Sequence, residues 1–228
     1  MTSKSALEVL YPFLHGKQQD PAAVDAGLLH SIEEKARESR ETNASFFTEQ
    51  AGVLLDAAKA LAAVYRRGGK MFTMGNGGSS CDASHVAVEF LHPITAGRPA
   101  LAAINLTADI AMTSAVANDV GFEHIFARQL IAHARAGDGL VGLSTSGNSA
   151  NLIAAFAKAK EMGLTTVGLS GGDGGKMAKV CDHCLVVPTM SVHRIQECHV
   201  AAYHILWDLV HTLLADDRGS TINKDVAA

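Results

Sequence analysis

The stretch LVGLSTSGNSANLI, residues 140–153, joins a short apolar run to a pattern typical of a helix. Between them lies a turn in which Ser144, Thr145, Ser146 and Ser149 surround Gly147. Where a strand passes into a helix, the first N–H groups of the helix lack partners and the helix dipole is positive. Such a turn binds anions, and the hydroxyls add donors. We expect a phosphate here, although a single serine of this kind is as often an ordinary helix cap.

Short apolar runs recur on both sides of this stretch, with helical patterns between them. They occupy residues 71–75, 101–106, 139–145, 165–170 and 183–188. Such brief runs, bounded by Gly, Ser, Thr or Pro, are typical of buried strands. Their alternation with helices predicts an α/β fold with a five-stranded parallel sheet, flanked by helices, and ligand sites at the carboxyl ends of the strands.

The two ends of the chain frame this sheet with further helices. Apolar residues recur at three- and four-residue steps from residue 44 until Gly68 and Gly69, and a shorter, more charged helix is expected within residues 24–42. A long helix is predicted over residues 191–214. We expect an N-terminal extension (1–24), one domain (25–215) and a polar C-terminal tail (216–228).

Composition excludes several classes of function. Hydrophobic residues make up 48% of the 228 residues and the formal charge is −4, which gives no electrostatic reason to expect nucleic acid or an acidic membrane as a partner. No apolar run approaches the roughly 20 residues that span a bilayer, and the start lacks the pattern of a signal peptide. A cytoplasmic protein is expected.

The four cysteines are too few for a disulfide scaffold. Cys181 and Cys184 form a CxxC pair, but it runs into an expected strand and no second pair exists to complete a zinc site. Redox or metal chemistry by this pair is the less favoured interpretation.

A second glycine-rich turn follows the first predicted strand. In GNGGSSCDASH the residues Gly75, Gly77 and Gly78 permit close approach of the backbone to a ligand, and Asn76 can bond hydroxyl groups. The turn matches neither the dinucleotide nor the nucleoside triphosphate motif in full.

Two pairs of side chains at helical spacing suggest a metal. His85 and Glu89 are four residues apart, and Gln196 and His204 are eight apart, so each pair lies near one face of its helix. Together they form a set that Zn²⁺ accepts, although a His–Glu pair at this spacing is more often a contact on a helix surface. Similarly, Asn118 and Asp119 form either a plain turn or a contact to sugar hydroxyls.

Five segments together resemble a known family. GNGGSSCDASHVAVE, AVANDVGFEHIFARQL, LSTSGNSANLI, GLSGGDGGKMA and RIQECHVAAYHIL are similar to the sugar isomerase (SIS) domain and, within it, to the phosphoheptose isomerases. The hydroxyl-rich turn is shared by many phosphosugar proteins. HxxxE combined with RIQE and a later histidine is more specific.

The resemblance implies isomerisation of sedoheptulose 7-phosphate to D-glycero-D-manno-heptose 7-phosphate, in bacterial heptose biosynthesis. It implies a homotetramer with one zinc per subunit. The metal positions are His85, Glu89, Gln196 and His204, and Glu89 and His204 match the acid–base pair. The substrate positions are Asn76, Gly77, Gly78, Glu89, Asn118, Asp119, Ser144, Thr145, Ser146, Ser149 and Gln196.

Two alternatives remain open from the sequence. A phosphosugar sensor, or an adaptor of replication initiation, would keep the phosphate turn but lose the acid–base residues, and here Glu89 and His204 are both present. An isomerase of a shorter phosphosugar is the second alternative. The sequence leaves open whether the zinc is catalytic, and whether Glu89 acts as a base through its second oxygen.

Overall fold

The computed structural model describes residues 21–216. The chain divides into two units, residues 1–40 and residues 41–228. The predicted extension (1–24) and tail (216–228) lie almost entirely outside the described residues, so their boundaries stay predictions. Among residues 21–216, no helix combines the length and the apolar character that a bilayer crossing requires.

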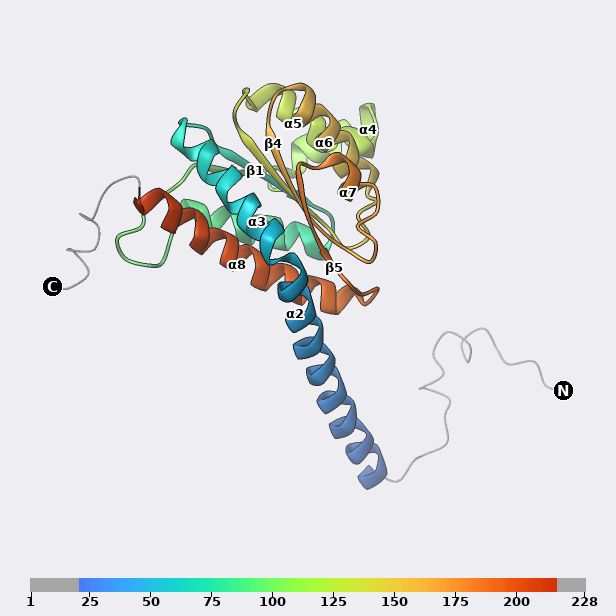
Figure 1. Ribbon diagram of the computed structural model, residues 1–228. Helices are drawn as coiled ribbons and strands as arrows, with labels where there is room; N and C mark the ends of the chain where they lie inside the picture. Colours follow the sequence, from blue (N-terminus) through green and yellow to red (C-terminus); the bar gives the residue numbers. More distant parts are fainter. Residues whose placement is uncertain (1–20, 217–228) are drawn as a thin grey trace. The chain divides into compact units, whose positions relative to one another are not determined.

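A five-stranded parallel sheet forms the centre of the larger unit (Figure 1), which confirms the predicted fold class. Its order is β2-β1-β3-β4-β5, with every neighbouring pair parallel. The strands are β1 (Met71–Gly75), β2 (Ala103–Asn105), β3 (Gly139–Ser144), β4 (Thr165–Gly171) and β5 (His183–Val187). The inner strands β1 and β3 are buried along their whole length, which explains their unbroken apolar sequence. The edge strand β2 pairs with β1 alone and is shorter than predicted.

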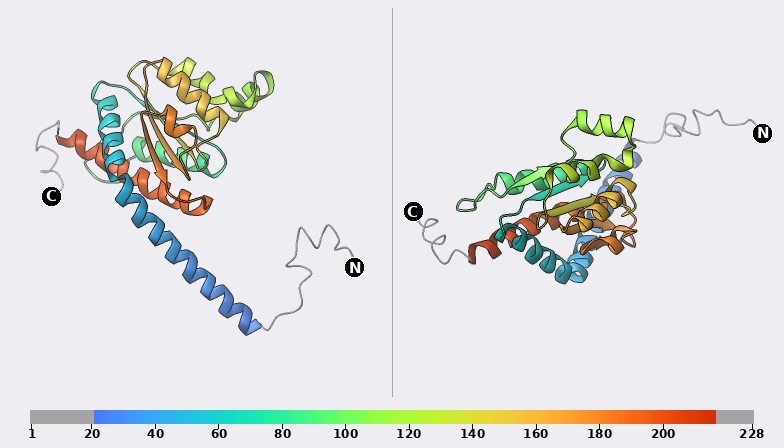
Figure 2. Two further views of the ribbon diagram at one scale, coloured as in Figure 1. Left: turned by 45° about the vertical axis from the view of Figure 1, so that its right-hand side comes forward. Right: turned by 90° about the horizontal axis from the view of Figure 1, so that it is seen from above.

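Helices cover both faces of this sheet, as two further views show (Figure 2). One core joins Val141 of β3 to helices α2, α3 and α8, and the other joins Leu140 to α5 and α6. Successive residues of a strand point to opposite faces, so β3 contributes to both cores. The helices are α2 (Pro21–Arg66), α3 (Gly78–Leu91), α4 (Ile110–Asp119), the 3₁₀ turn η2 (Phe122–His124), α5 (Ile125–His133), α6 (Ala150–Glu161), α7 (Met177–Val180) and α8 (Val192–Asp216).

Helix α2 corrects one prediction. The sequence suggested two helices before β1, but residues 21–66 form one helix. No Gly or Pro interrupts the proposed junction, and neighbouring polar side chains find partners along the helix: Ser45 Oγ donates to Glu49 Oε1 at 2.6 Å and Thr48 Oγ1 to the Ala44 carbonyl at 2.7 Å. The predicted stop is confirmed, because α2 ends at Arg66 and Gly68 adopts a φ of +78°.

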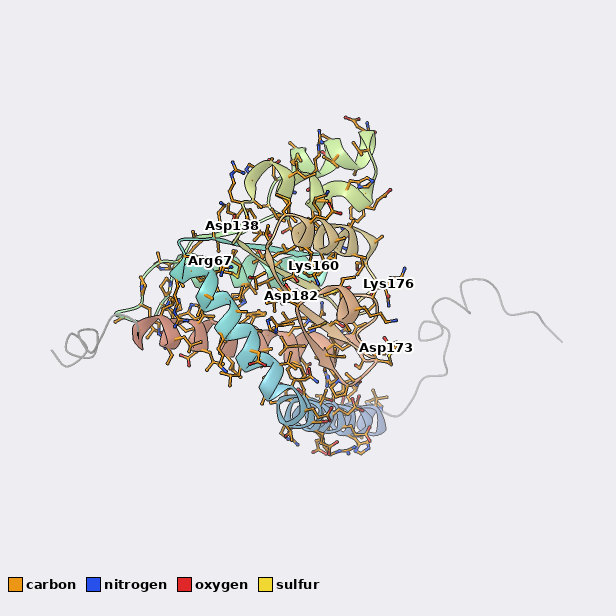
Figure 3. All side chains as sticks on the ribbon, turned by 45° about the horizontal axis from the view of Figure 1, so that its top comes forward. Arg67, Asp138, Lys160, Asp173, Lys176 and Asp182 are labelled. Carbon is orange, nitrogen blue, oxygen red and sulfur yellow. The ribbon has the colours of Figure 1, made fainter. Side chains whose placement is uncertain are left out.

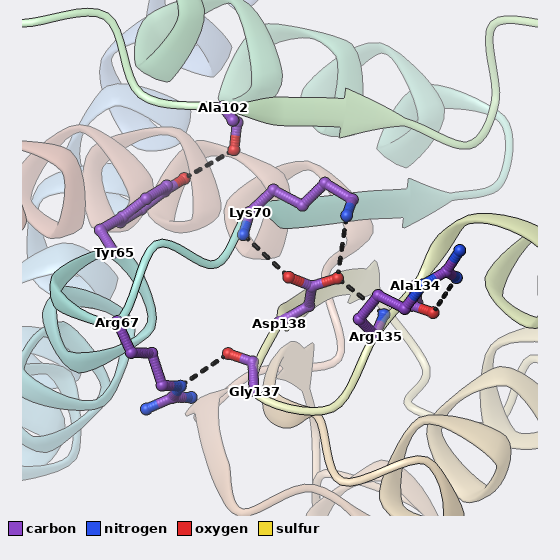
Figure 4. A network of polar contacts seen from close by, with 8 residues as sticks. All are labelled: Tyr65, Arg67, Lys70, Ala102, Ala134, Arg135, Gly137 and Asp138. Carbon is purple, nitrogen blue, oxygen red and sulfur yellow. Dashed lines mark hydrogen bonds and ion pairs between the residues drawn. The ribbon is translucent and has the colours of Figure 1, made fainter.

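A buried carboxylate braces the amino ends of β1 and β3 (Figure 4). Asp138 is 3% exposed and accepts hydrogen bonds from the backbone N–H groups of Lys70 (3.0 Å) and Arg135 (2.8 Å). Lys70 Nζ adds an ion pair at 3.2 Å. From the end of α2, Arg67 Nε donates to the Gly137 carbonyl at 2.8 Å. These contacts lie at the opposite end of the strands from their carboxyl termini, so we assign them to stability.

A similar contact joins β4 to the start of β5, where Asp182 faces Lys160 of α6 (Figure 3). The Asp182 carboxylate accepts from Thr166 N at 2.9 Å and Thr166 Oγ1 at 2.8 Å. Partial burial opposes ionisation, but the bonds from Thr166 and the charge of Lys160 leave the pKa of Asp182 below its usual value. The neighbouring Cys181 and Cys184 are free thiols.

Candidate functional site

The glycine-rich and hydroxyl-rich turns lie side by side, because β1 and β3 are neighbours and both turns follow carboxyl ends. Two amides tie them together. Asn76 Nδ2 donates to Asn151 Oδ1 at 2.9 Å, and Asn151 Nδ2 donates back to Asn76 Oδ1 at 2.8 Å. The pairing fixes the loop after β1 against the start of α6.

The hydroxyl-rich turn has the geometry expected of an anion site. Ser149 is the N-cap of α6, but its side chain makes no capping hydrogen bond. Its Oγ instead lies 3.0 Å from the Oγ of the buried Ser144. Leu152 N donates to Asn151 Oδ1 at 3.1 Å. The N–H groups before it are not capped by Ser149 and can meet an anion. Ser146 is exposed, and Thr145 is half-buried.

The loop after β4 supports this turn. Gly147 adopts a φ of +63°, and a Cβ atom at this position would lie 2.1 Å from the Gly174 carbonyl oxygen. Asn148 Oδ1 accepts from the backbone N–H of Lys176 at 3.1 Å. Glycine at position 147 is therefore required by both backbone conformation and close packing.

Two hollows flank the turns. One of about 210 Å³ is lined by Thr145, Ser146, Asn148, Gly171, Gly172, Asp173, Met190, Val192 and Ile195. The other, of about 190 Å³, is lined by Gly75, Asn76, Gly77, Ser80, Thr107, Thr113, Phe122, Ile125 and Phe126. Each predicted loop therefore borders a concave surface of the size of a small ligand.

Helices α3 and α8 bring three of the predicted metal ligands together. One ligand atom from each of His85, Glu89 and His204 lies within 4.8 Å of the other two. His85 Nε2 is 3.1 Å from Glu89 Oε1, and the rings of His85 and His204 have centroids 4.9 Å apart. All three residues are partly buried, so the group faces a space that is accessible from outside.

This group fits a divalent metal ion of borderline softness. Two imidazoles and a carboxylate are donors that Zn²⁺ takes, at bond lengths of about 2.0–2.2 Å. Tetrahedral bonds of that length place two ligand atoms about 3.3–3.5 Å apart. The 3.1 Å between His85 Nε2 and Glu89 Oε1 is close to that separation.

Gln196, the fourth predicted ligand, packs on the loop after β1. Its Nε2 lies 2.5 Å from the position that a Cβ atom on Gly78 would occupy. Glycine at 78 therefore makes room for this amide. The contact places Gln196 beside the predicted substrate loop, and its role as a metal ligand stays a prediction.

Asn118 and Asp119 are the last two residues of helix α4. Both are exposed, and Asn118 Nδ2 donates to Asp119 Oδ1 at 2.7 Å. Neither side chain lines the two hollows described above. Their contact with a sugar stays a prediction.

The sequence did not single out three residues behind the metal group. Tyr203 Oη lies 2.8 Å from His85 Nδ1, and Asp82 shares a hydrogen bond with the same hydroxyl. Trp207 Nε1 donates to the Glu89 carbonyl at 2.8 Å. Burial raises the pKa of Asp82, although His85 and Tyr203 oppose this, and burial also raises the pKa of Tyr203. Of these three residues, only Asp82 could have been noticed in the sequence, because it stands three residues before His85 and so lies near the same face of α3.

Comparison with known proteins shows the family of the chain. The SIS domain family matches residues 36–171. A phosphoheptose isomerase of Desulfovibrio desulfuricans is 41% identical over 205 residues, covering 86% of this chain and 98% of the relative. One from Rhodospirillum rubrum is 44% identical over 186 residues, with 80% and 99% covered.

A solved structure shares the fold. The phosphoheptose isomerase of Neisseria gonorrhoeae superposes with a TM-score of 0.77 at 37% identity, covering 81% of this chain and 99% of that one. These matches run over nearly the full length of the relatives. The chain therefore belongs to the SIS domain family and, within it, to the phosphoheptose isomerases.

Proposed function

We propose that this enzyme isomerises sedoheptulose 7-phosphate to D-glycero-D-manno-heptose 7-phosphate, an aldose–ketose conversion that supplies heptose precursors. Its relatives carry the name phosphoheptose isomerase. The observation that carries the proposal is the meeting of Glu89 with His85 and His204. An isomerase needs such titratable groups, whereas a sensor of phosphosugars does not.

The phosphate binds at the turn before α6. Ser144, Thr145, Ser146 and Ser149 supply hydroxyl donors, and the start of α6 supplies N–H groups and the positive dipole end. The hydroxyl groups, the N–H groups and the helix dipole together hold the phosphate in place, so the site needs no buried cation.

The sugar chain then extends across the loop after β1. Asn76, Gly77 and Gly78 contact its hydroxyls, together with Gln196, which packs on Gly78. Asn118 and Asp119 are assigned to the same role, since both are exposed polar side chains at the end of α4.

Glu89 and His204 transfer the protons. A base removes a proton from C1 of the ketose, a cis-enediolate forms, and an acid returns a proton to C2. Glu89 Oε1 faces His85 Nε2, which leaves Oε2 as the oxygen that takes the proton. His204, on the other helix, then transfers protons to and from the oxygen atoms at C1 and C2.

We further propose that His85, Glu89, Gln196 and His204 hold one zinc ion per subunit. A bound zinc supplies Lewis-acid stabilisation of the oxyanion. Gln196 is an unusual ligand for zinc, and its nearness to Gly78 makes it equally suited to bind the sugar.

A homotetramer in the cytoplasm completes the proposal. Within residues 21–40, Leu28, Leu29 and Ile32 are 58–64% exposed and lie at helical spacing. An apolar stripe of this kind suits packing between helices of identical copies.

The test is to incubate the purified chain with sedoheptulose 7-phosphate and to follow the aldoheptose phosphate by NMR, with and without added zinc. We expect product. Absence of product with retained binding of the phosphosugar would favour the sensor or adaptor function. Product from a pentulose or hexulose phosphate alone would favour the isomerase of a shorter sugar.

A further inference from the structure

The second nitrogen of the His85 ring meets a buried hydroxyl. His85 turns Nε2 toward Glu89, while its Nδ1 lies 2.8 Å from Tyr203 Oη. Tyr203 is 1% exposed, and its ring meets the His85 ring edge-on at a centroid distance of 5.2 Å. The tyrosine is therefore held rigidly by the core, and its hydroxyl is directed at one nitrogen.

A carboxylate lies behind this hydroxyl. Asp82 shares a hydrogen bond with Tyr203, and it stands three residues before His85 on the same face of α3. Three groups thus form a chain from Asp82 through Tyr203 to His85, built from one turn of α3 and one residue of α8.

With Asp82 ionised, this chain favours one arrangement of the protons. An ionised carboxylate only accepts hydrogen bonds, so the Tyr203 hydroxyl donates to Asp82 and offers its lone pair to His85. Nδ1 of His85 then carries the ring proton and donates to the tyrosine. The lone pair of the neutral imidazole is left on Nε2, the atom that faces Glu89.

We propose that Tyr203 and Asp82 are positioning residues that hold His85 in the tautomer and orientation in which Nε2 offers its lone pair to a metal ion. The inference rests on the metal site of the proposed function. Histidines that bind metals usually donate their other N–H group to a carboxylate or carbonyl, and here a tyrosine relays that bond. Nε2 lies 3.1 Å from Glu89 Oε1, a hydrogen-bonding distance, and a bound cation would take the place of the proton between these two atoms.

Zinc affinity of the full chain, measured without substrate, tests this role. The protein is stripped of metal and titrated with zinc against a chromophoric chelator. Tyr203→Phe removes one oxygen atom, and we expect zinc affinity to fall about 10- to 100-fold. Tyr65→Phe is the matched control, because the Tyr65 hydroxyl donates to the Ala102 carbonyl at 3.3 Å, and its zinc affinity should equal that of the wild type.

A second variant tests the chain as a unit. Asp82→Ala leaves the tyrosine hydroxyl free to donate to Nδ1, which moves the ring proton to Nε2 and weakens zinc binding. Because both substitutions break one chain, the double variant should bind zinc no more weakly than the worse single variant. If Tyr203→Phe fails to fold, Asp82→Ala alone carries the same expectation, since Asp82 is only partly buried.

Wild-type affinity in a folded Tyr203→Phe protein, or losses that multiply in the double variant, would overturn the inference. A wild-type chain that binds no zinc would overturn it too, together with the proposed metal. In that case the separate NMR assay would still decide whether the chain catalyses the isomerisation.

Discussion

Gly78 shows how a single residue sets the spacing between two parts of the site. A Cβ atom there would lie 2.5 Å from Gln196 Nε2, so glycine is what allows the amide of α8 to rest on the loop after β1. The backbone of Gly78 needs no glycine, because its φ is not among the positive values. The residue is therefore kept small by its neighbour rather than by its own conformation.

Gly78→Ala should therefore damage the site and spare the fold. The methyl group displaces Gln196, and we expect kcat/KM to fall about 10- to 100-fold, since small misplacements have effects of this size. Stability measured by urea unfolding should change by no more than about 1 kcal/mol, because alanine favours a helix. Gly52→Ala, in α2 with open space around it, is the control and should keep full activity. Unchanged kcat/KM in Gly78→Ala would contradict the role of Gln196.

At the scale of the element, α8 connects the site to the sheet. On this helix, Gln196 and His204 face the site. His199 contacts the sheet instead, because its Nε2 lies 3.1 Å from the Ser170 carbonyl oxygen of β4. His199 is fully buried, and its Nδ1 has no partner among the described residues. Burial lowers the pKa of His199 to about 4, although the bond to Ser170 opposes this.

Acid should accordingly loosen the attachment of α8. The unfolded chain binds a proton at His199 near pH 6.5, whereas the folded chain does so only near its pKa of about 4, so stability falls as the pH drops through this window. These two values predict a loss of about 2 kcal/mol between pH 7.5 and pH 5.

Urea unfolding at the two pH values measures this loss. His199→Leu should lack the contribution, so its loss between pH 7.5 and pH 5 should be about 2 kcal/mol smaller than that of the wild type. His133→Leu replaces an exposed histidine at the end of α5 and should keep the wild-type slope. If wild type and His199→Leu lose the same unfolding free energy between pH 7.5 and pH 5, His199 is not a buried neutral histidine in the folded chain.

Elements were predictable where one strong signal acted alone. Strand β1 has the predicted bounds because its short, mostly apolar run ends at Gly75, and α2 stops where Gly68 and Gly69 were expected to stop it. The junction within α2 was misread because Thr42 and Asn43 are weak helix formers, and weak propensity is overridden when no residue breaks the helix.

Site residues were predictable where spacing revealed a shared face. His85 and Glu89 could be paired from the spacing on one helix, and Gln196 and His204 from the spacing on another, while the resemblance to a family was needed to favour a metal at these positions. The pairing of Asn76 with Asn151, 75 residues apart, depends on β1 and β3 being neighbours, which the order of strands in the sequence does not reveal. Tyr203 carried no signal, because a tyrosine in an amphipathic helix is more often part of the core.

For the whole molecule, the sheet separates stability from chemistry. The amino ends of β1 and β3 are braced by Asp138 and Lys70, while the carboxyl ends carry the two glycine-containing turns. Ligand sites at carboxyl ends are the rule in parallel sheets, since helix N-termini meet there. Helices α3 and α8 add a carboxylate and two imidazoles, which can exchange protons or bind a metal ion, as backbone N–H groups cannot.

The central claim is that Glu89 moves a proton between C1 and C2 of a phosphosugar. Proton transfer through an enediolate exchanges with solvent, whereas a direct hydride shift from C1 to C2 does not. The two routes differ in where the hydrogen on C2 of the aldose comes from, and this can be read by NMR after reaction in D₂O.

The most direct measurement is therefore the deuterium content at C2 of the aldoheptose 7-phosphate formed from sedoheptulose 7-phosphate in D₂O. The wild type and the surface control Glu161→Gln should give product labelled at C2, and Glu89→Gln, whose amide cannot act as a base, should give neither product nor label. Product without deuterium at C2, or labelled product from Glu89→Gln at the wild-type rate, would contradict the account.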